Sequence, residues 1–472
     1  MTSTPHTPLL IIGAGSGGYA AAFRAADLGL QVTLVDIEKN PGGVCLYRGC
    51  IPTKALLHVS KIITQAQDAA SIGISFNDLH ADPARINRFK DDVVAKLTAG
   101  LGQLSKLRKI HYIQGRARFL DSNSVSVTTP DGQDSQITYD HAVLATGSTP
   151  IQLPFASWSD RVIPSALALN VETIPQSLLI IGGGYIGLEF ASFYSALGTK
   201  VTIIEMMPDI LPGADSDIVA ILKKRFVARM AAVHVQCKVT AVEEKQDLCT
   251  VSFEDKDGRK TQAEFEKVLV AVGRKPLTHD LALDKTKIEL DDDGCVKVNP
   301  QRQTSDPAIY AIGDLTGQPM LAHKAAHEGL VAAQNIAGQK TAFHPAAIPA
   351  VVFTDPEIAW CGLTETEAKE KDIPIKVLKF PWTASGRAVT LNRSDGLTKI
   401  LVEPKSGKLL GMTIVGEFAG EMIGEGVLAM NKAATAEDIM QTIHPHPTLS
   451  ETIPEAAAGF HNQSLHIYRP PT

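Results

Sequence analysis

The residues of this chain best suited to chemistry are two of its six cysteines. Cys45 and Cys50 lie five positions apart in the segment GGVCLYRGCIPTK, and they could be a redox pair, a structural disulfide, two metal ligands or buried filler. Residues five apart on an ideal helix point about 140° away from each other, so a bond between these sulfurs needs a local distortion, which Gly49 and Pro52 can supply. A bond that closes so small and distorted a loop is expected to be easily reduced.

Metal binding and a purely structural disulfide are the less favoured interpretations of this pair. C-x4-C lies at the edge of zinc spacing, and the later HPH segment is a poor match to H-x3–5-H, so we expect no metal. The chain is expected to be cytosolic, where a close cysteine pair is more often catalytic or metal-binding than structural. The other cysteines have no motif spacing and are expected to be small buried or neutral surface residues. They are Cys237, Cys249, Cys295 and Cys361.

The C-terminal segment QTIHPHPTLSETIPEA offers a base for thiol chemistry, which needs one because the thiolate is the nucleophile. Pro447 stiffens the chain after His446. Glu451 could bind the other ring nitrogen of His446, which would fix its tautomer and raise its basicity. An ordinary surface or core histidine is the alternative for His446, and it is our interpretation of His444.

A dinucleotide-binding module occurs twice, without a gap, and the second copy lies 169 residues after the first. The copies are LLIIGAGSGGYAAAFRAADLGLQVTLVD (9–36) and LLIIGGGYIGLEFASFYSALGTKVTIIE (178–205). Each predicts a buried strand, a glycine turn, a helix and a second strand. The first fingerprint glycine permits the tight turn, the second lets the backbone approach a pyrophosphate at the helix N-terminus, and the third packs the helix on the strand. These glycines are Gly13, Gly15 and Gly18 in the first copy and Gly182, Gly184 and Gly187 in the second.

An acidic residue closes the second strand of each copy, where a carboxylate can accept hydrogen bonds from ribose hydroxyls. These acids are Asp36 and Glu205. Two full fingerprints predict two dinucleotides, or one dinucleotide bound twice. Because Glu205 would repel a 2′-phosphate and the following MMPDI offers no arginine to receive one, the second module is predicted to bind NAD rather than NADP.

A shorter phrase recurs three times, as an apolar strand that ends in a small residue, a glycine and a turn. The copies are AVLATGSTP (142–150), VLVAVGRKP (268–276) and IYAIGDLTG (309–317). They predict crossover segments that return beneath a bound cofactor. Asp314, in the third copy, could meet a cofactor hydroxyl, and a helix cap or Asx-turn is its alternative.

A path for electrons from a dithiol through a flavin to nicotinamide would explain why two dinucleotide modules accompany a cysteine pair. A dithiol gives up two electrons when it becomes a disulfide, nicotinamide accepts a hydride, and flavin can link the two. Because GGVCLYRGC follows within seven residues of Asp36, the first module is predicted to hold FAD and the second NAD. Pro52 suits a first helical turn, so Lys54 is expected near a helix start, where its charge would favour an anionic reduced flavin. A solvated helix charge is the alternative for Lys54.

The bulk composition is that of an ordinary globular chain, with 44% hydrophobic and 20% charged residues. The net charge of −6 points to neither nucleic acid nor an anionic membrane surface as a partner. No apolar run reaches the roughly 18 residues of a membrane helix. The N-terminal MTSTPHTP has neither the basic region nor the apolar core of a signal peptide, so we expect a cytoplasmic protein.

These residues resemble a known family. GGVCLYRGCIPTKALL, ATGS, GGGYIGLE, AVGRKP, AIGD, LAHKAAHEG, TDPEIAWCGLTE and HPHPTLSE occur in order along nearly the whole chain and are similar to motifs of the disulfide-containing flavoprotein reductases, above all of members that oxidise dihydrolipoamide with NAD+. The resemblance implies an α/β fold with two Rossmann-like domains and an α+β dimerisation domain. Its regions would be 1–148 for FAD, 149–275 for NAD, 276–344 for a central segment on the FAD side, and 345–472 for the interface.

The resemblance also implies roles for individual residues. Cys45 and Cys50 would form a redox-active disulfide, with Cys45 as the interchange thiol that meets substrate and Cys50 as the thiolate beside the flavin. His446 would be the acid–base group and Glu451 its orienter, both completing the cysteine site of the other subunit of a homodimer. The cofactor sites would include Asp314, which would bind the ribityl chain of the flavin, and Lys54, which would pair with Glu189. Four further residues would contact the cofactors. These four are Gly115, Thr146, Gly147 and Gly273.

The partner that the resemblance implies is a lipoylated carrier protein or domain of a 2-oxo acid dehydrogenase complex or of the glycine cleavage system. Three positions depart from the family pattern. Between the cysteines, Tyr47 and Arg48 replace an Asn and a small apolar residue, and in the first dinucleotide module Asp36 replaces the usual Glu. Arg48 places a charge between the cysteines that could lower a thiolate pKa, an effect that the sequence does not decide. The alternatives are an NADPH-dependent glutathione-type reductase, which Glu205 disfavours, a mercuric reductase, and a redox-sensing protein without turnover.

Overall fold

The two dinucleotide modules fold in the same way in the computed structural model, which describes residues 5–468. In both, the first fingerprint glycine turns the chain with a positive φ, 98° at Gly13 and 110° at Gly182, which glycine adopts without a Cβ clash. The first module consists of β1 (His6–Ile12), α1 (Ser16–Asp27) and β2 (Val32–Asp36). The second consists of β9 (Ser177–Ile181), α5 (Tyr185–Ala196) and β10 (Lys200–Ile204).

The first module lies in a seven-stranded sheet of order β3-β2-β1-β6-β5-β4, with β17 pairing to β6. Strand β6 changes partners along its length, because residues 134–138 pair antiparallel with β5 and residues 142–144 pair parallel with β17. The central segment of the chain thereby lies on the first sheet, where α7 also packs against α1. The remaining elements are β3 (His111–Gln114), β4 (Arg116–Asp121), β5 (Ser124–Thr128), β6 (Asp134–Leu144), β17 (Ile309–Ala311) and α7 (Ala322–Ile336).

The second module lies in a parallel sheet of order β11-β10-β9-β15-β8, beside an antiparallel sheet β12-β13-β14 that the sequence reasoning did not predict. Two short strands, β7 and β16, pair antiparallel and join the two dinucleotide regions. The elements are β7 (Ser148–Pro150), β8 (Val162–Pro164), α6 (Ser216–Phe226), β11 (Ala232–His234), β12 (Cys237–Glu244), β13 (Cys249–Asp255), β14 (Lys260–Phe265), β15 (Lys267–Val270) and β16 (Arg274–Pro276).

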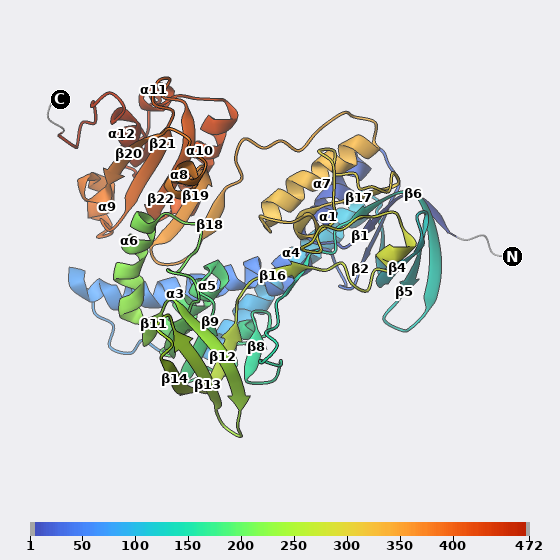
Figure 1. The fold of residues 1–472 in the computed structure, drawn as a ribbon, viewed down its shortest axis with the longest axis horizontal. Helices are drawn as coiled ribbons and strands as arrows, with labels where there is room; N and C mark the ends of the chain where they lie inside the picture. The colour runs from blue at the N-terminus through green and yellow to red at the C-terminus, as the bar shows by residue number, and fades with distance from the viewer. Residues whose placement is uncertain (1–4, 469–472) are drawn as a thin grey trace.

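The C-terminal region is an antiparallel sheet of order β18-β19-β22-β21-β20, covered by short helices, at the upper left of Figure 1. Its strands are β18 (Ala350–Val352), β19 (Glu357–Gly362), β20 (Lys376–Pro381), β21 (Leu397–Val402) and β22 (Leu409–Gly416). Its helices are α8 (Glu365–Glu370), α9 (Gly386–Thr390), α10 (Ala419–Asn431), α11 (Ala436–Gln441) and α12 (Thr452–Ala458). We call this region the interface region.

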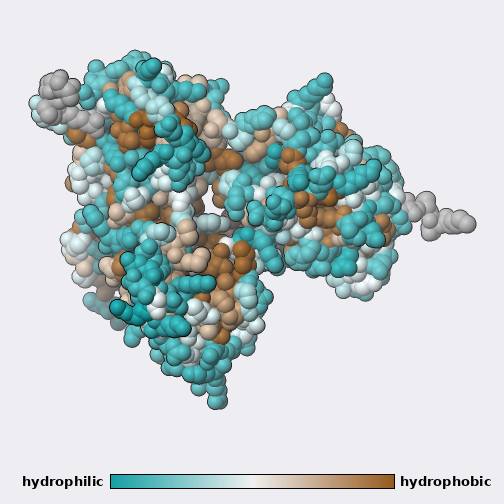
Figure 2. Space-filling model, viewed as in Figure 1, coloured by the Kyte–Doolittle hydropathy of each residue, from teal (hydrophilic) through white to brown (hydrophobic). Residues whose placement is uncertain are grey.

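Two long helices connect the lobes. Helices α3 (Cys50–Asp68) and α4 (Pro83–Leu107) leave the lobe of the first sheet and reach beneath the interface region (Figure 1). One hydrophobic core cluster contains buried residues of all three parts, among them Leu56 of α3, Phe190 of α5 and Val352 of β18. Figure 2 shows a notch between the lobe of the first sheet and the interface region.

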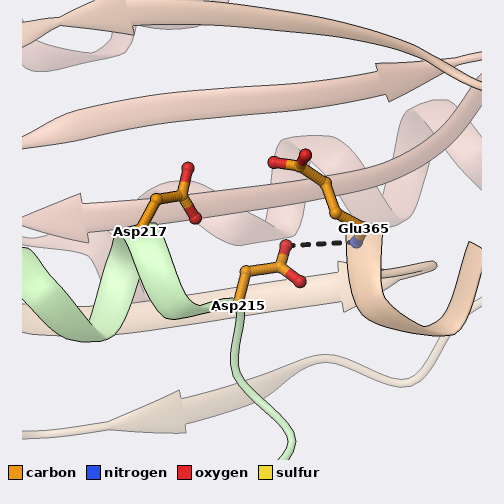
Figure 3. A group of neighbouring side chains, drawn as sticks. All are labelled: Asp215, Asp217 and Glu365. Atoms are coloured by element: carbon orange, nitrogen blue, oxygen red, sulfur yellow. Dashed lines mark hydrogen bonds between the residues drawn. The ribbon is translucent and has the colours of Figure 1, made fainter. Parts of the chain in front are cut away.

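A buried ionic cluster also joins the second module to the interface region. Asp215 and Asp217, at the start of α6, converge with Glu365 of α8, and Asp215 accepts a hydrogen bond from the Glu365 backbone (Figure 3). The three carboxylates have the spacing of a possible metal site. The ammonium of Lys399, on β21, lies 2.6, 2.8 and 2.9 Å from them with only 1% of its side chain exposed, so a lysine already supplies the positive charge there.

Candidate active site

The cysteine pair lies at a break between two helices. Cys45 is in α2 (Gly43–Arg48), and Cys50 is the first residue of α3. Gly49 between them has φ −145° and ψ −117°, which is not helical, and a Cβ there would lie 2.8 Å from the carbonyl oxygen of Val44. The predicted distortion at Gly49 is therefore present, and it lets the two thiols approach each other as a regular helix would not.

The two thiols are electrostatically unequal. A hydrogen bond from the Cys45 thiol lowers the pKa of Cys50 to about 7, and the charge of Lys54 acts in the same direction against the effect of burial. The same hydrogen bond and burial raise the pKa of Cys45 above its usual range, although Ser16 opposes them. When both thiols are free, the negative charge therefore resides on Cys50.

Lys54 connects the cysteine helix to the second module. Its Nζ lies 3.0 and 2.8 Å from the two carboxylate oxygens of Glu189, which is 3% exposed. Glu189 also accepts a hydrogen bond from the Phe353 backbone at 3.1 Å, and the Lys54 ammonium lies 4.6 Å from the centre of the Phe353 ring. This contact brings α3, α5 and the interface region to one point beside Cys50.

The two strand-closing acids occupy equivalent positions in the two modules. Asp36 accepts hydrogen bonds from Ala14 N at 2.5 Å and Glu38 N at 2.9 Å. Glu205 accepts from the two equivalent backbone N–H groups of the second module at 2.6 and 2.7 Å. Burial raises the pKa of Asp36 to about 6 despite these bonds. Each acid thus ties the end of its strand to the glycine turn.

The glycine turns have the shape that a bound pyrophosphate requires. A Cβ on Gly13 would lie 2.4 Å from Ala145 O, and one on Gly18 would lie 1.8 Å from Gly13 O, so these glycines serve the packing of the chain itself. A Cβ on Gly15 or Gly184 would meet no atom closer than 3.9 Å. Neither helix has a side-chain cap, so the N–H groups of its first turn face this open side and fit a phosphate.

Asp314 lies beside the β7–β16 link. It accepts a hydrogen bond from Ser148 Oγ of β7, and Arg274 Nε of β16 donates to that same oxygen at 2.7 Å. The short helix that contains Asp314 has no side-chain cap, so the helix-cap alternative does not apply. Glu328 of α7, which is fully buried, accepts from Gly313 N at 2.6 Å and thereby supports the turn.

The other predicted cofactor residues lie at the ends of the strands. Thr146 Oγ1 donates to a backbone carbonyl at 3.0 Å. Gly147 and Gly273 have positive φ of 77° and 121° at the turns after β6 and β15. Gly115 N donates to the carbonyl of Asp36 at 2.8 Å. Whether these residues contact a cofactor stays a prediction.

His446 and Glu451 lie together in the interface region. His446 Nδ1 is 2.8 Å from Glu451 Oε1, and 77% of the histidine side chain is exposed. Burial raises the pKa of Glu451, but hydrogen bonds from Thr448 N and His446 outweigh it and hold the pKa below its usual range. Within residues 5–468, His446 has no hydrogen bond or ion pair to the cysteine segment. The catalytic roles of this pair stay predictions.

Sequence reasoning left one residue undecided and missed others. Arg48 pairs with Glu38, and its charge opposes the effect of burial on the pKa of Asp36. Ser16 beside Cys45 was missed, although it follows the fingerprint glycine directly. Glu328 was missed too, although LAHKAAHEG, the segment that contains it, was part of the resemblance.

Comparison with protein families identifies the chain. Residues 7–329 match the family described as pyridine nucleotide-disulphide oxidoreductase, and residues 348–457 match the dimerisation domain of that family. The chain belongs to the pyridine nucleotide-disulphide oxidoreductases. The predicted fold class, with two dinucleotide-binding domains and a dimerisation domain, is confirmed, and the dimerisation domain supports a homodimer.

Individual members of the family match over nearly the whole chain. The dihydrolipoyl dehydrogenase of Haemophilus influenzae is 45% identical over 461 residues, which is 98% of this chain and 96% of the relative. That of Geobacillus stearothermophilus is 44% identical over 462 residues, with 98% of each chain covered. Among solved structures, LpdA from Mycobacterium tuberculosis has a TM-score of 0.89 at 27% identity, over 96% of this chain and 99% of the other.

These similarities confirm the predicted enzyme class and cofactors at the level of the family. The chain is an oxidoreductase, and members of this family use FAD and NAD. The flavoprotein disulfide reductase RclA from Escherichia coli is a further structural neighbour, with a TM-score of 0.86 at 26% identity over 96% of this chain and 99% of the other. No helix within the described residues is both long and apolar enough to cross a membrane.

Proposed function

We propose that the chain acts as a dihydrolipoyl dehydrogenase, which oxidises dihydrolipoamide to lipoamide and reduces NAD+ to NADH. The observation that carries this proposal is the unequal cysteine pair, with the lowered pKa on Cys50 and the raised pKa on Cys45, next to two dinucleotide modules. The identity of 41–45% to proteins named dihydrolipoyl dehydrogenase supports the substrate.

The thiol steps follow from the residues of this chain. His446 of one subunit accepts a proton from a substrate thiol, and the resulting thiolate attacks the sulfur of Cys45 in the Cys45–Cys50 disulfide of the other subunit. The S–S bond of the enzyme breaks, and Cys50 leaves as a thiolate, stabilised by its lowered pKa. The second substrate thiol then attacks the substrate sulfur bonded to Cys45 and displaces Cys45, which takes up the proton of that thiol in keeping with its raised pKa. The substrate is thereby oxidised by two electrons and the enzyme dithiol is reduced. Bound FAD supplies the two-electron link from this dithiol to NAD+.

Orientation of the base is the role that we assign to Glu451. Its hydrogen bond to Nδ1 of His446 leaves Nε2 as the exposed nitrogen that meets substrate. In the same way, Lys54 and Glu189 hold a charge pair beside Cys50, and Asp314 and the fingerprint residues hold the cofactors. We further propose the four regions 1–148, 149–275, 276–344 and 345–472.

The physiological partner that we propose is a lipoylated carrier protein of a 2-oxo acid dehydrogenase complex or of the glycine cleavage system. A cytoplasmic location belongs to the same proposal.

The activity is tested with purified protein in four assays that pair NADH or NADPH with lipoamide or glutathione disulfide. We expect rapid turnover only with NADH and lipoamide, because the Glu205 carboxylate disfavours a 2′-phosphate. Turnover with NADPH and glutathione disulfide alone would contradict the substrate and cofactor assignment, and no turnover with any disulfide would contradict the enzymatic role.

A further inference from the structure

The loop that carries His446 has a single buried side chain. The loop runs from the end of α11 at Gln441 to the turn that begins at Leu449, and residues 441–447 are exposed except for His444. The side chain of His444 is 8% exposed, against 77% for His446 and 96% for the neighbouring Ile443. The loop therefore has no apolar anchor, and His444 ties it to α10 through Glu425.

Both ring nitrogens of His444 face acceptors. Nδ1 lies 2.8 Å from the carbonyl oxygen of Thr442, and Nε2 lies 2.9 Å from Oε1 of Glu425. A neutral imidazole has only one N–H, so both contacts are hydrogen bonds when the ring carries two protons. With either number of protons the ring can donate to the carboxylate of Glu425, and hydrogen bonds to charged acceptors are stronger than neutral ones.

Glu425 provides a rigid anchor because it lies on α10. This helix packs against β19 and β22 of the interface region. At Gly426, the residue after Glu425, helix α10 lies very close to the sheet. A Cβ there would lie 2.9 Å from Met412 Sδ and 3.0 Å from Cys361 Sγ. The position of Glu425 is therefore set by the packing of the helix on the sheet.

The other end of the loop is held separately. Thr448 N donates to Glu451 Oε2 at 2.8 Å, and Thr448 Oγ1 donates to the carbonyl of Pro445 at 2.7 Å. Pro445 and Pro447 restrict the backbone on both sides of His446, since proline fixes φ near −65°. His446 thus lies between two tethered points, of which only the first depends on His444.

We propose that His444 and Glu425 are positioning residues for His446, which rests on the proposed function. They fix the loop so that Nε2 of His446 is presented to the cysteine site of the other subunit, while Glu451 fixes the ring orientation. Loss of the tether lets the loop move. A displacement of about 1 Å at a reacting group can lower the rate about a hundredfold.

Three substitutions of His444 separate its two contacts. In H444Q the side-chain nitrogen can reach the position of Nε2 and keep the bond to Glu425, and in H444N it can reach the position of Nδ1 and keep the bond to Thr442. H444F preserves the size of the side chain and keeps neither bond. E425Q retains an acceptor but removes the charge, and it tests the same tether without changing the loop. H446Q serves as the reference for loss of the base.

Each variant is assayed as the FAD-loaded dimer in two reactions, NADH with lipoamide and NADH with ferricyanide. Ferricyanide accepts electrons without the dithiol and so does not need His446. We expect H444F to lose tenfold or more in kcat with lipoamide while its ferricyanide rate is unchanged, E425Q to show a smaller loss of the same kind, and H444Q to recover more activity than H444N.

The outcomes that would overturn the inference are distinct from failure of the proposed function. If H446Q loses lipoamide activity but H444F and E425Q keep it, the tether is not needed. If H444F loses both activities equally, His444 is a general structural residue and the inference is wrong. If the wild-type chain has no lipoamide activity, the proposed function fails and the inference falls with it.

Discussion

Replacement of Lys399 by methionine should destabilise the contact between the second dinucleotide module and the interface region. The Lys399 ammonium makes bonds of 2.6, 2.8 and 2.9 Å to Asp215, Asp217 and Glu365. Methionine keeps most of the volume but leaves the buried Asp215 carboxylate without a cation, whereas Lys379 still contacts Asp217 and Glu365. Removal of one partner of a buried ion pair costs about 3–5 kcal/mol. Because Asp217 and Glu365 are about one third exposed and water compensates them, we expect the lower end, about 3 kcal/mol.

Lys379 provides a matched control. Its ammonium lies 2.7 Å from Asp217 and 3.3 Å from Glu365, but 38% of its side chain is exposed. K379M should therefore cost about 0–1 kcal/mol. The assay is chemical denaturation of both variants and the wild type at equal dimer and FAD concentrations, compared by transition midpoint, since a multidomain protein need not unfold in two states. Equal midpoints for K399M and K379M would refute the argument from burial, and D215N added to K399M should restore part of the loss.

Three further predictions concern the cofactor turns, the nicotinamide choice and the thiol. G18A should prevent folding of the first module, because its Cβ would lie 1.8 Å from Gly13 O, whereas G15A should fold but retain less FAD. Circular dichroism measures folding and flavin absorbance measures bound FAD in the two variants. A G18A protein that folds and binds FAD would contradict the argument that Gly18 is needed for packing. E205A should weaken NADH binding and reduce the preference over NADPH, measured as the ratio of kcat/KM values; an unchanged ratio would remove Glu205 from the site. Because the pKa of reduced Cys50 is lowered to about 7 with help from Lys54, its thiolate should be lost as pH falls through 7, and K54M should move that loss to higher pH, as followed by thiolate absorbance.

The sequence predicts the repeated dinucleotide module well because the residues that determine its fold are close together in the chain. The glycine turn, the helix and the strand-closing acid are set by residues within about 30 positions, and the two copies have helices that begin at Ser16 and Tyr185, 169 residues apart. The cysteine break at Gly49 was predictable for the same reason. The antiparallel sheet β12-β13-β14 was not predicted, since its segments become strands by pairing with each other.

The family resemblance implied one contact between distant residues, the Lys54–Glu189 pair, which the structure contains, but other such contacts could not be predicted from the sequence. Lys399 bonds to Asp215, 184 positions away, and nothing near either residue indicates the partner. His444 was interpreted as an ordinary histidine because its partner, Glu425, lies 19 positions earlier, on helix α10. The sequence did not decide the role of Arg48, which lies between the cysteines, and its side chain pairs with Glu38. In each case the fold, rather than the spacing, selects the partner of a charged group.

The central claim is that the two sulfurs are unequal and that Cys50 carries the thiolate beside the flavin. The most direct measurement is the absorption spectrum of purified, FAD-loaded C45S and C50S at pH 8, above the pKa of Cys50 of about 7. We expect C45S to show a long-wavelength thiolate–flavin band without any reductant and C50S to show none. A band in C50S, or its absence in C45S, would contradict the assignment.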